Sequence, residues 1–216
     1  TDRIKRHLNE MKPSSALIIG GGFIGLEMAE NLRGLGMKVT VVEMADQVMA
    51  NLDYEMASVV HRHLITHGVE LLLKDGVISF EKTGDFIKTR LGSGREIGSA
   101  MVILSIGVRP DTKLAREAGL EIGGRGGIVV NEHLQTSDPD IYAVGDAIEF
   151  RHPLTGQNTI TFLAGPANKQ GRIAADNIVN GNRKAYSGTI ATAVAKIFDL
   201  TVASTGANEK LLKASG

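Results

Sequence analysis

The sequence predicts an α/β protein in which a parallel sheet is combined with an antiparallel meander. Short apolar runs alternate with amphipathic stretches over residues 16–73, which is typical of strand–helix–strand crossovers in a parallel sheet. Alternating strands separated by turn residues follow over residues 77–97, which indicates hairpins. Glycines gather directly after several of the apolar runs, where strands are expected to end.

The first part of the chain predicts three parallel strands and two helices. We expect the strands at 16–19, 39–42 and 69–73. The first helix follows three glycines and ends near Gly34–Gly36, and its apolar residues at helical spacing are Ile24, Met28, Leu32 and Leu35. The second begins after Asp53, a suitable N-cap residue, and ends at His67–Gly68. Its expected apolar stripe is Met56, Val59 or Val60, and Leu64.

Three short strands then form the meander, and a fourth buried strand rejoins the parallel sheet. The meander strands are expected at 77–80, 86–91 and 96–97, with turns at 83–85 and 92–94. The buried strand is expected at 101–104.

Residues 108–111 interrupt this pattern and are the candidate domain boundary. Beyond them we expect a short helix at 112–118, a strand at 128–130 and a strand at 141–144 that ends at Gly145–Asp146. A longer helix is expected to begin near Pro166 and to end at Asn180–Gly181. Its inward residues should be Ala167, Ala174 and Ile178.

Composition excludes several classes of function. Lysine and arginine number 24, equal to aspartate and glutamate, so no net field attracts nucleic acid or an acidic membrane surface. No apolar run approaches the roughly 20 residues of a membrane helix, and the polar start is not a signal peptide. Cysteine is absent, which excludes thiol chemistry within this chain and fits a cytoplasmic protein.

The glycines at 20, 22 and 25 form a Gly-x-Gly-x-x-Gly loop between a predicted strand and a predicted helix. Gly20 permits the tight turn, Gly22 lets the backbone approach a pyrophosphate, and Gly25 lets the helix pack closely on the strand. The helix N-terminus offers free N–H groups and partial positive charge to phosphates. The loop therefore predicts a Rossmann-like dinucleotide site that includes Gly21, Phe23 and Ile24.

Glu43 follows the second strand, 18 residues after Gly25. A carboxylate at this place accepts hydrogen bonds from the adenosine ribose hydroxyls and repels a 2′-phosphate. The next residues, Met44, Ala45 and Asp46, provide no arginine, so NADH is favoured over NADPH. The competing interpretation is a purely structural glycine turn with a solvated glutamate. Glu27, an acid in the first helical turn, is explained by the helix dipole alone.

With these motifs, the chain resembles the pyridine nucleotide–disulfide oxidoreductases, and most closely the branch of coenzyme A–disulfide reductases, NADH oxidases and NADH peroxidases. The resemblance covers nearly the whole chain and rests on residues 20–30, 105–110, 141–146, 163–168 and 196–201. It implies an NAD(H)-binding domain at 13–108, inserted in a partial FAD-binding domain whose C-terminal half is 109–183. Residues 184–216 would begin a dimerisation domain of a homodimer.

The resemblance also implies roles for individual residues. Glu27 would neighbour the nicotinamide, and Gly107 would lie where its carboxamide docks. The FAD-binding residues would be Gly145, Asp146, Ala164 and Ala167, with Asp146 on the ribitol chain. Asn168 would help form the thiol-substrate site. The family's first FAD fingerprint and its redox cysteine are not in these 216 residues, so the redox cysteine is expected upstream and the isolated chain is expected to be inactive.

Three functions therefore remain open. The first is part of an NADH-dependent coenzyme A disulfide or persulfide reductase, the second an NADH oxidase or peroxidase of the same architecture, and the third a stand-alone NAD-binding module. Histidines 61, 63 and 67 share one predicted helix, and His63 and His67 share a face that could hold a metal. No Glu-x-x-His motif or cysteine accompanies them, so the sequence favours a structural or solvated role and predicts no metal site.

Overall fold

The computed structural model describes residues 2–215, which fall into two compact units. The first comprises the described residues up to Gly107 together with Val194–Val202. The second comprises Val108–Ala193 and the described residues from Ala203 onward. Within residues 2–215, no helix is long and apolar enough to span a membrane.

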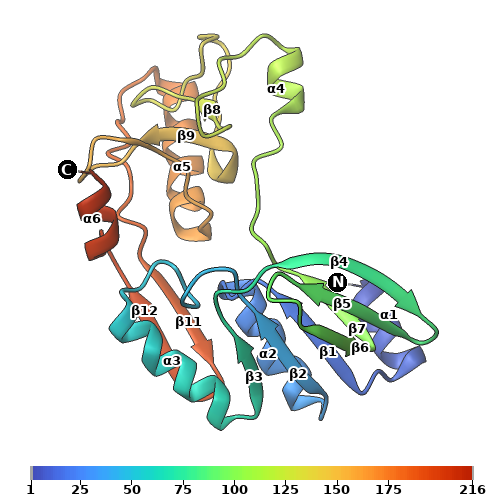
Figure 1. The fold of residues 1–216 in the computed structure, drawn as a ribbon. Coiled ribbons are helices and arrows are strands. Elements are labelled where there is room, and N and C mark those ends of the chain that lie inside the picture. Colours follow the sequence, from blue (N-terminus) through green and yellow to red (C-terminus); the bar gives the residue numbers. More distant parts are fainter. Residues whose placement is uncertain (1, 216) are drawn as a thin grey trace. The chain divides into compact units, whose positions relative to one another are not determined.

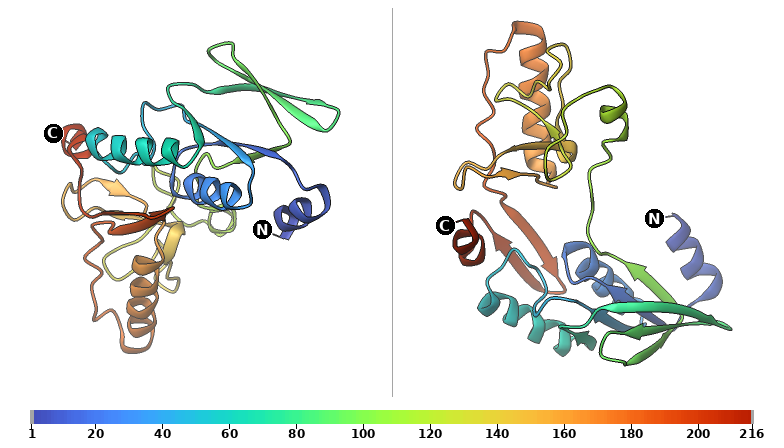
Figure 2. Two further views of the ribbon diagram at one scale, coloured as in Figure 1. Left: turned by 90° about the horizontal axis from the view of Figure 1, so that it is seen from below. Right: turned by 45° about the horizontal axis from the view of Figure 1, so that its top comes forward.

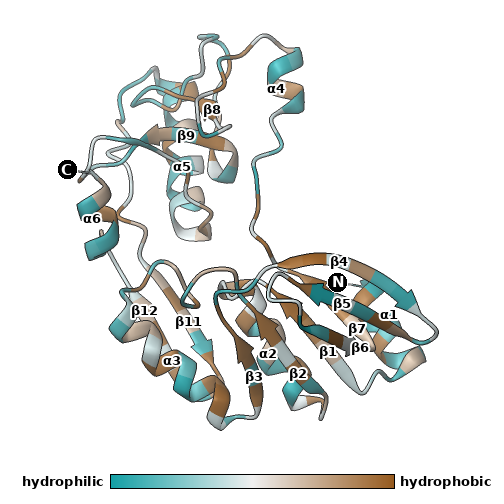
Figure 3. Ribbon diagram, viewed as in Figure 1, coloured by the Kyte–Doolittle hydropathy of each residue, from teal (hydrophilic) through white to brown (hydrophobic). Residues whose placement is uncertain are grey.

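A four-stranded parallel sheet forms the centre of the first unit (Figure 1). Its strand order is β3-β2-β1-β7, with β1 at Ser15–Ile19, β2 at Lys38–Val42, β3 at Val69–Leu72 and β7 at Met101–Leu104. Ala16 of β1 lies beside Val39 on one side and Met101 on the other, so β1 is an interior strand of the sheet. Figure 3 shows how strongly hydrophobic these strands are, as expected of a sheet covered on both faces.

Helices cover one face of this sheet and a meander covers the other (Figures 1 and 2). The helices are α1 (Asp2–Met11), α2 (Phe23–Gly34) and α3 (Tyr54–Thr66), and their inward residues share one core with Ile18 and Val41. The antiparallel strands are β4 (Val77–Thr83), β5 (Phe86–Leu91) and β6 (Glu96–Ser99). Leu91 and Ile97 of the meander pack on Leu17 and Ile19 of β1. The predicted α/β fold, with a parallel sheet and an antiparallel meander, is confirmed.

The buried faces of α2 and α3 match the predicted stripes only in part: Leu32, Val60 and Leu64 are buried as expected. In α2 the buried residues are Gly25, Leu26, Ala29 and Leu32, whereas Ile24 and Leu35 are mostly exposed. In α3 they are Ala57, Val60 and Leu64, whereas Met56 and Val59 are exposed. The physical reason is that small residues let each helix pack closely on the sheet. A prediction based on the large apolar residues therefore places part of the buried face incorrectly. Asp53 is the N-cap of α3, as predicted, but its side chain makes no capping hydrogen bond.

A hairpin from the end of the chain joins the first unit. Its strands are β11 (Ala193–Ile197) and β12 (Leu200–Ser204). Ala195 and Ile197 are buried in the same core as α3, and Phe198 packs against that core. Neither this hairpin nor helix α1 was predicted from the sequence.

The second unit is built around the long helix α5 and a small sheet. Its elements are α4 (Lys113–Glu117), β8 (Ile128–Val129), the 3₁₀ turn η1 (Gly145–Ala147), β9 (Ile148–Arg151), β10 (Asn158–Thr159), α5 (Ala164–Asn180) and α6 (Glu209–Ser215). The sheet order is β10-β9-β8, and β8 and β9 are parallel. Leu134, Ile148, Phe150, Ile173 and Tyr186 form its core.

Two predictions for the second unit are wrong. Residues 141–144 do not form a strand, since they make only a single bridge, between Tyr142 and Gln135. The strand follows Gly145 instead, because the positive φ of Gly145 redirects the chain before Ile148–Arg151 pairs with β8. In α5, Ile178 is exposed, and the buried face is Gln170, Ile173, Ala174 and Asn177. Two polar residues hold buried positions, which an apolar pattern cannot anticipate.

Candidate functional site

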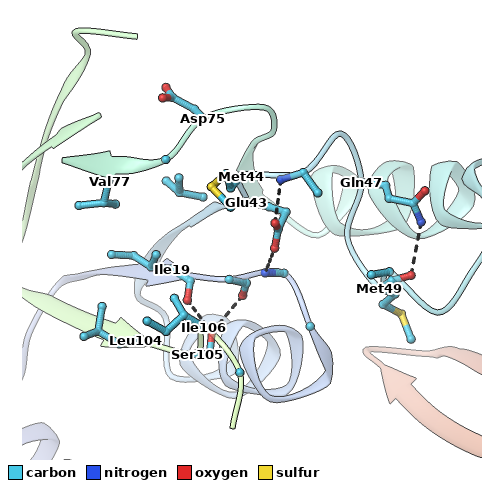
Figure 4. Close-up of a pocket in the computed structure, with 18 of the residues that line it drawn as sticks. Ile19, Glu43, Met44, Gln47, Met49, Asp75, Val77, Leu104, Ser105 and Ile106 are labelled. Atoms are coloured by element: carbon cyan, nitrogen blue, oxygen red, sulfur yellow. Dashed lines mark hydrogen bonds between the residues drawn. The ribbon is translucent and has the colours of Figure 1, made fainter. Parts of the chain in front are cut away.

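A pocket of about 640 Å³ opens at the carboxyl ends of β1, β2 and β7, entirely within the first unit (Figure 4). In an open parallel sheet this edge is where ligands bind. Its walls come from the glycine loop, the segment after β2, the start of β4 and the end of β7. The lining includes Gly20, Gly21, Gly22, Glu43, Asp75, Ser105 and Gly107.

The glycine loop has little room for side chains where it turns and open space where a ligand would lie. A Cβ on Gly20, which has φ +106°, would lie 2.3 Å from the Ser105 carbonyl oxygen. A Cβ on Gly25 would lie 2.0 Å from the Gly20 carbonyl oxygen. A Cβ on Gly22 would meet nothing within 4 Å. The loop therefore packs tightly against β7 and α2 and leaves the Gly22 side accessible.

Gly22 is also the N-cap of α2, which begins at Phe23. The first N–H groups of an α-helix have no partner within the helix, and they carry partial positive charge. The open space at Gly22 thus adjoins a set of N–H donors suited to phosphate oxygens.

Glu43 is held in place by two backbone N–H groups. The Gly21 N–H donates to its Oε2 over 2.7 Å, and the Ala45 N–H donates to its Oε1 over 2.8 Å (Figure 4). The backbone of Glu43 continues the β2–β3 pairing, with its N–H donating to the Leu72 carbonyl over 2.8 Å. Each carboxylate oxygen has a second lone pair, so Glu43 can still accept from ligand hydroxyls.

Two polar residues of the pocket were not singled out from the sequence. Ser105 donates to the carbonyls of Ile19 and Gly20, at 2.9 and 3.0 Å, and so ties β7 to the glycine loop. Asp75 adds a second carboxylate to the lining. The side-chain hydrogen bond from Ser93 is the main cause that lowers the pKa of Asp75 and keeps it charged. Both residues depend on partners that are distant in the sequence, so no short motif identifies them.

The segment after Glu43 closes the side of the pocket through buried polar contacts. The Val48 N–H donates to Nε2 of His61 over 3.1 Å, which requires a ring nitrogen without a proton. Burial lowers the pKa of His61, and the charge of Asp46 only partly opposes this effect. Gln47 donates to the Leu52 carbonyl over 2.9 Å. The function of His61 is therefore to support the pocket loop.

Four residues that the sequence placed in the dinucleotide site are not in the pocket lining. Gly25 is buried in α2. Phe23 is half-buried and packs against the helical core. Ile24 is exposed on the first turn of α2. Glu27 is exposed beyond the first turn, which holds no acidic residue, so the expected interaction of a first-turn acid with the helix dipole is wrong. Gly107, by contrast, lines the pocket and has a φ of +98°, a conformation that favours glycine.

The residues expected to contact FAD lie in the second unit. Gly145 begins the turn η1, and its N–H donates to the buried side chain of Gln170 on α5 over 2.7 Å. This bond places Asp146, which is exposed, next to α5. A Cβ on Gly145 would lie 3.7 Å from that of Ala167, in ordinary contact. Ala164 and Asn168 are exposed in the first turns of the same helix.

Comparison with known proteins shows which family has this architecture. The family model for pyridine nucleotide-disulphide oxidoreductases matches residues 1–171. The crystal structure of the reduced CoADR-RHD protein of Bacillus anthracis matches 99% of this chain and 38% of that chain, with 55% identity and a TM-score of 0.94. A NAD-dependent persulfide reductase from A. fulgidus matches 99% of this chain and 39% of that chain, with 41% identity and a TM-score of 0.94.

Among curated proteins, an NADH oxidase of Methanocaldococcus jannaschii is 38% identical over 94% of this chain and 45% of its own length. The chain spans about half the length of the curated relatives it matches. The family model covers most of the chain, and the observed parallel sheet with its meander agrees with the matched structures. The chain therefore belongs to the pyridine nucleotide-disulphide oxidoreductase family.

Proposed function

We propose that this chain provides NADH binding and hydride delivery within an FAD-dependent NADH:disulfide oxidoreductase that acts on coenzyme A disulfide or a persulfide. Proteins of this family use NAD(P)H and FAD. The observation that carries the proposal is the Glu43 carboxylate, held by the Gly21 N–H at the edge of the 640 Å³ pocket. Pockets of about 300–1,000 Å³ are typical of cofactor sites.

The pocket residues fit a dinucleotide without a 2′-phosphate. The pyrophosphate would lie over Gly22 and receive hydrogen bonds from the N–H groups that begin α2. The free lone pairs of Glu43 would accept from the ribose hydroxyls. The carboxylates of Glu43 and Asp75 both repel a 2′-phosphate, and the lining includes no arginine or lysine to attract one.

The remaining site residues are assigned to the nicotinamide, to FAD and to the thiol substrate. We assign Gly107 to the nicotinamide carboxamide and Glu27 to the neighbourhood of the nicotinamide. Gly145, Asp146, Ala164 and Ala167 are assigned to FAD, since the Gly145–Gln170 bond places Asp146 beside the N-terminal part of α5. Bound FAD would accept the hydride from NADH. Asn168 is assigned to the thiol substrate.

These roles imply a division of the chain and a homodimeric whole protein. We assign residues 13–108 to NAD(H) binding, 109–183 to the C-terminal half of the FAD-binding domain and 184–216 to the beginning of the dimerisation domain. The similarity to the B. anthracis CoADR-RHD protein and the A. fulgidus persulfide reductase supports a disulfide or persulfide as acceptor. The similarity to an NADH oxidase supports oxygen or peroxide as the second candidate.

Calorimetric titration with NADH tests the first part of the proposal. The informative variant is Gly22→Asp, because a carboxylate there has space and is a favoured helix N-cap, yet repels a pyrophosphate. We expect it to weaken NADH binding at least about ten-fold without loss of stability. The matched control is Gly98→Asp, at an exposed meander position where a Cβ also meets nothing within 4 Å. Equal NADH affinity in both variants would reject this site.

The acceptor is tested with the full-length protein under NADH. Coenzyme A disulfide, a persulfide, oxygen and hydrogen peroxide are offered separately, and NADH oxidation is followed by absorbance. We expect turnover with the disulfide or persulfide to exceed turnover with oxygen and peroxide. The reverse order would identify the oxidase or peroxidase, and NADH binding without turnover of any acceptor would identify a binding module.

A further inference from the structure

The turn of the β11–β12 hairpin lies near α3 within the first unit (Figure 1). Three side chains of types that bind metals meet there. His63 lies in the last turn of α3, His67 is the C-cap residue that follows the helix, and Asp199 lies in the hairpin turn. One ligand atom from each residue lies within 4.8 Å of the other two. The sequence identified the histidine pair, but the hairpin adds the carboxylate.

The distances suit ligands of a common ion. Oδ1 of Asp199 lies 3.0 Å from Nε2 of His63 and 3.4 Å from Nε2 of His67. Metal–ligand bonds of about 2.0–2.1 Å place neighbouring corners of a tetrahedron about 3.3 Å apart. A single ion could therefore bind all three atoms after small adjustments of the side chains.

The His67 ring is oriented as in known metal sites. Its Nδ1 lies 2.9 Å from the His63 carbonyl oxygen, which can only accept, so Nδ1 carries the proton and donates it. The lone pair is then on Nε2, the atom nearest Asp199. Second-shell bonds of this kind fix the tautomer of ligating histidines. The Phe198 ring stacks on the His67 ring, with centroids 4.2 Å apart and planes 14° apart, and restricts its rotation.

The burial of the His63 Nε2 atom fits the same site. This atom makes no hydrogen bond, and its ion-pair contact is Oδ1 of Asp199 at 3.0 Å. A buried polar atom without a hydrogen bond is uncommon in folded proteins and calls for an explanation such as an ion. A metal at the shared position would satisfy this nitrogen.

We propose that His63, His67 and Asp199 bind a divalent transition-metal ion of the Zn²⁺ class. Two imidazoles and one carboxylate suit Zn²⁺, whereas Mg²⁺ and Ca²⁺ prefer sites made of oxygen ligands alone. The Asp199 side chain is 82% exposed, which leaves room for water as a fourth ligand. The ion would fasten the β11–β12 hairpin to α3, two segments far apart in the sequence. This site is separate from the dinucleotide pocket, so the proposal does not depend on the proposed function.

Zn²⁺ binding to the tag-free chain tests the proposal, measured by calorimetry and by competition with a chromogenic chelator. We expect one Zn²⁺ per chain at this site and no comparable response to Mg²⁺. Asp199→Asn and His67→Gln should each weaken binding at least about ten-fold, the loss that even a second-shell partner typically causes. His7→Gln removes a histidine from α1 without touching the site, and it should bind Zn²⁺ like the parent chain.

Two further measurements separate a metal site from a plain ion pair between histidine and aspartate. Co²⁺ should give the visible absorption of a four-coordinate ion in the parent chain and in His7→Gln, but not in Asp199→Asn. Limited proteolysis at the hairpin should slow on adding Zn²⁺. Circular dichroism checks that the variants are folded, and the exposure of Asp199 favours this outcome. No Zn²⁺ binding, or equal binding in the parent chain and Asp199→Asn, would overturn the proposal.

Discussion

The backbone N–H of Gly21 donates to the carboxylate of Glu43 over 2.7 Å, and this bond joins the glycine loop after β1 to the end of β2. The residue expected to contact the ribose is therefore oriented by the loop expected to contact the pyrophosphate. A Cβ on Gly21 would lie 2.7 Å from the Val48 side chain and 3.3 Å from Oε2 of Glu43, so the loop has no room for a larger residue there. The two parts of the pocket depend on each other.

Replacing Glu43 should reduce the preference for NADH over NADPH. Glu43→Ala removes both the hydrogen-bond acceptor for the ribose and the negative charge that repels a 2′-phosphate. A hydrogen bond to a charged group contributes about 1.5–3 kcal/mol, so the ratio of the two affinities should fall at least about ten-fold. Calorimetry with NADH and NADPH measures this ratio directly.

The control for this measurement is Glu81→Ala, which removes an exposed glutamate from the meander. It changes the net charge equally but leaves the pocket lining intact. We expect the parental ratio of affinities in this variant. An unchanged ratio in Glu43→Ala would show that this carboxylate does not choose the cofactor.

Gly25 should be essential for stability in a way that another glycine of the same helix is not. A methyl group on Gly25 would lie 2.0 Å from the Gly20 carbonyl and 2.7 Å from Oγ of Ser105, so α2 must shift away from the loop. Overpacking of this kind typically costs about 1–3 kcal/mol. Urea denaturation of Gly25→Ala should show a loss of that size in the free energy of unfolding.

Gly34→Ala is the matched variant at the end of α2, where a Cβ meets nothing within 4 Å. Alanine is the better helix former, so this change should leave stability equal or raise it by up to about 1 kcal/mol. If both variants lose the same stability, close packing at Gly25 is not the cause.

Glu70 should make the stability of the first unit depend on pH. Burial alone would raise its pKa, but hydrogen bonds from Thr40, at 2.9 Å, and Arg95, at 2.5 Å, together with the Arg95 charge, lower the pKa below its usual value. With the folded pKa depressed, the contribution is fully present above the unfolded value and is lost as pH falls through the folded value. Chemical denaturation from about pH 6 to about pH 3 should show this loss, and Glu70→Gln should make it smaller.

The same pair should respond to salt. Glu70 on β3 and Arg95 between β5 and β6 join the parallel sheet to the meander, and both side chains are partly exposed. Since exposed charges are screened, the pH-dependent loss should shrink at about 1 M salt. Arg95→Met should reduce it in the same direction as Glu70→Gln. A pH profile identical in the parent chain and Glu70→Gln would contradict this account.

The sequence predicted the part of the fold that local chemistry determines. Two motifs with short spacings predict β1, α2 and β2. They are a glycine loop after a buried strand and a carboxylate at the end of the next strand. The meander was also predicted, because its turns at 83–85 and 92–94 separate strands of alternating polarity.

What the sequence did not reveal depends on partners that are distant along the chain. Ser105 is recognised as part of the pocket only when β7 lies beside β1, and Asp199 meets the α3 histidines only when the hairpin folds back. The strand after Gly145 was missed because residues 141–144 are also a short apolar run that could form a strand. In the folded chain it is Ile148–Arg151 that pairs with β8, and Ile148 and Phe150 that enter the core. Helix α1 is amphipathic, but it has no fully buried residue, and its polar sequence of mixed charge was not interpreted as a helix.

The second unit should be less stable on its own than the first, and the isolated chain should not retain flavin. Its strands β8 and β10 have two residues each, and its core is smaller than the core shared by β1, α2 and α3. We assign it only half of an FAD-binding domain, so the purified chain should be colourless after gel filtration.

Short strands and a small core open readily, so amides of Ile148–Phe150 should exchange hydrogen much faster than those of Ile18 and Val41. Light scattering during the experiment reports whether a second copy covers the unit. A yellow chain, or a monomer whose two units are equally protected, would show that the second unit folds and binds without the rest of its domain.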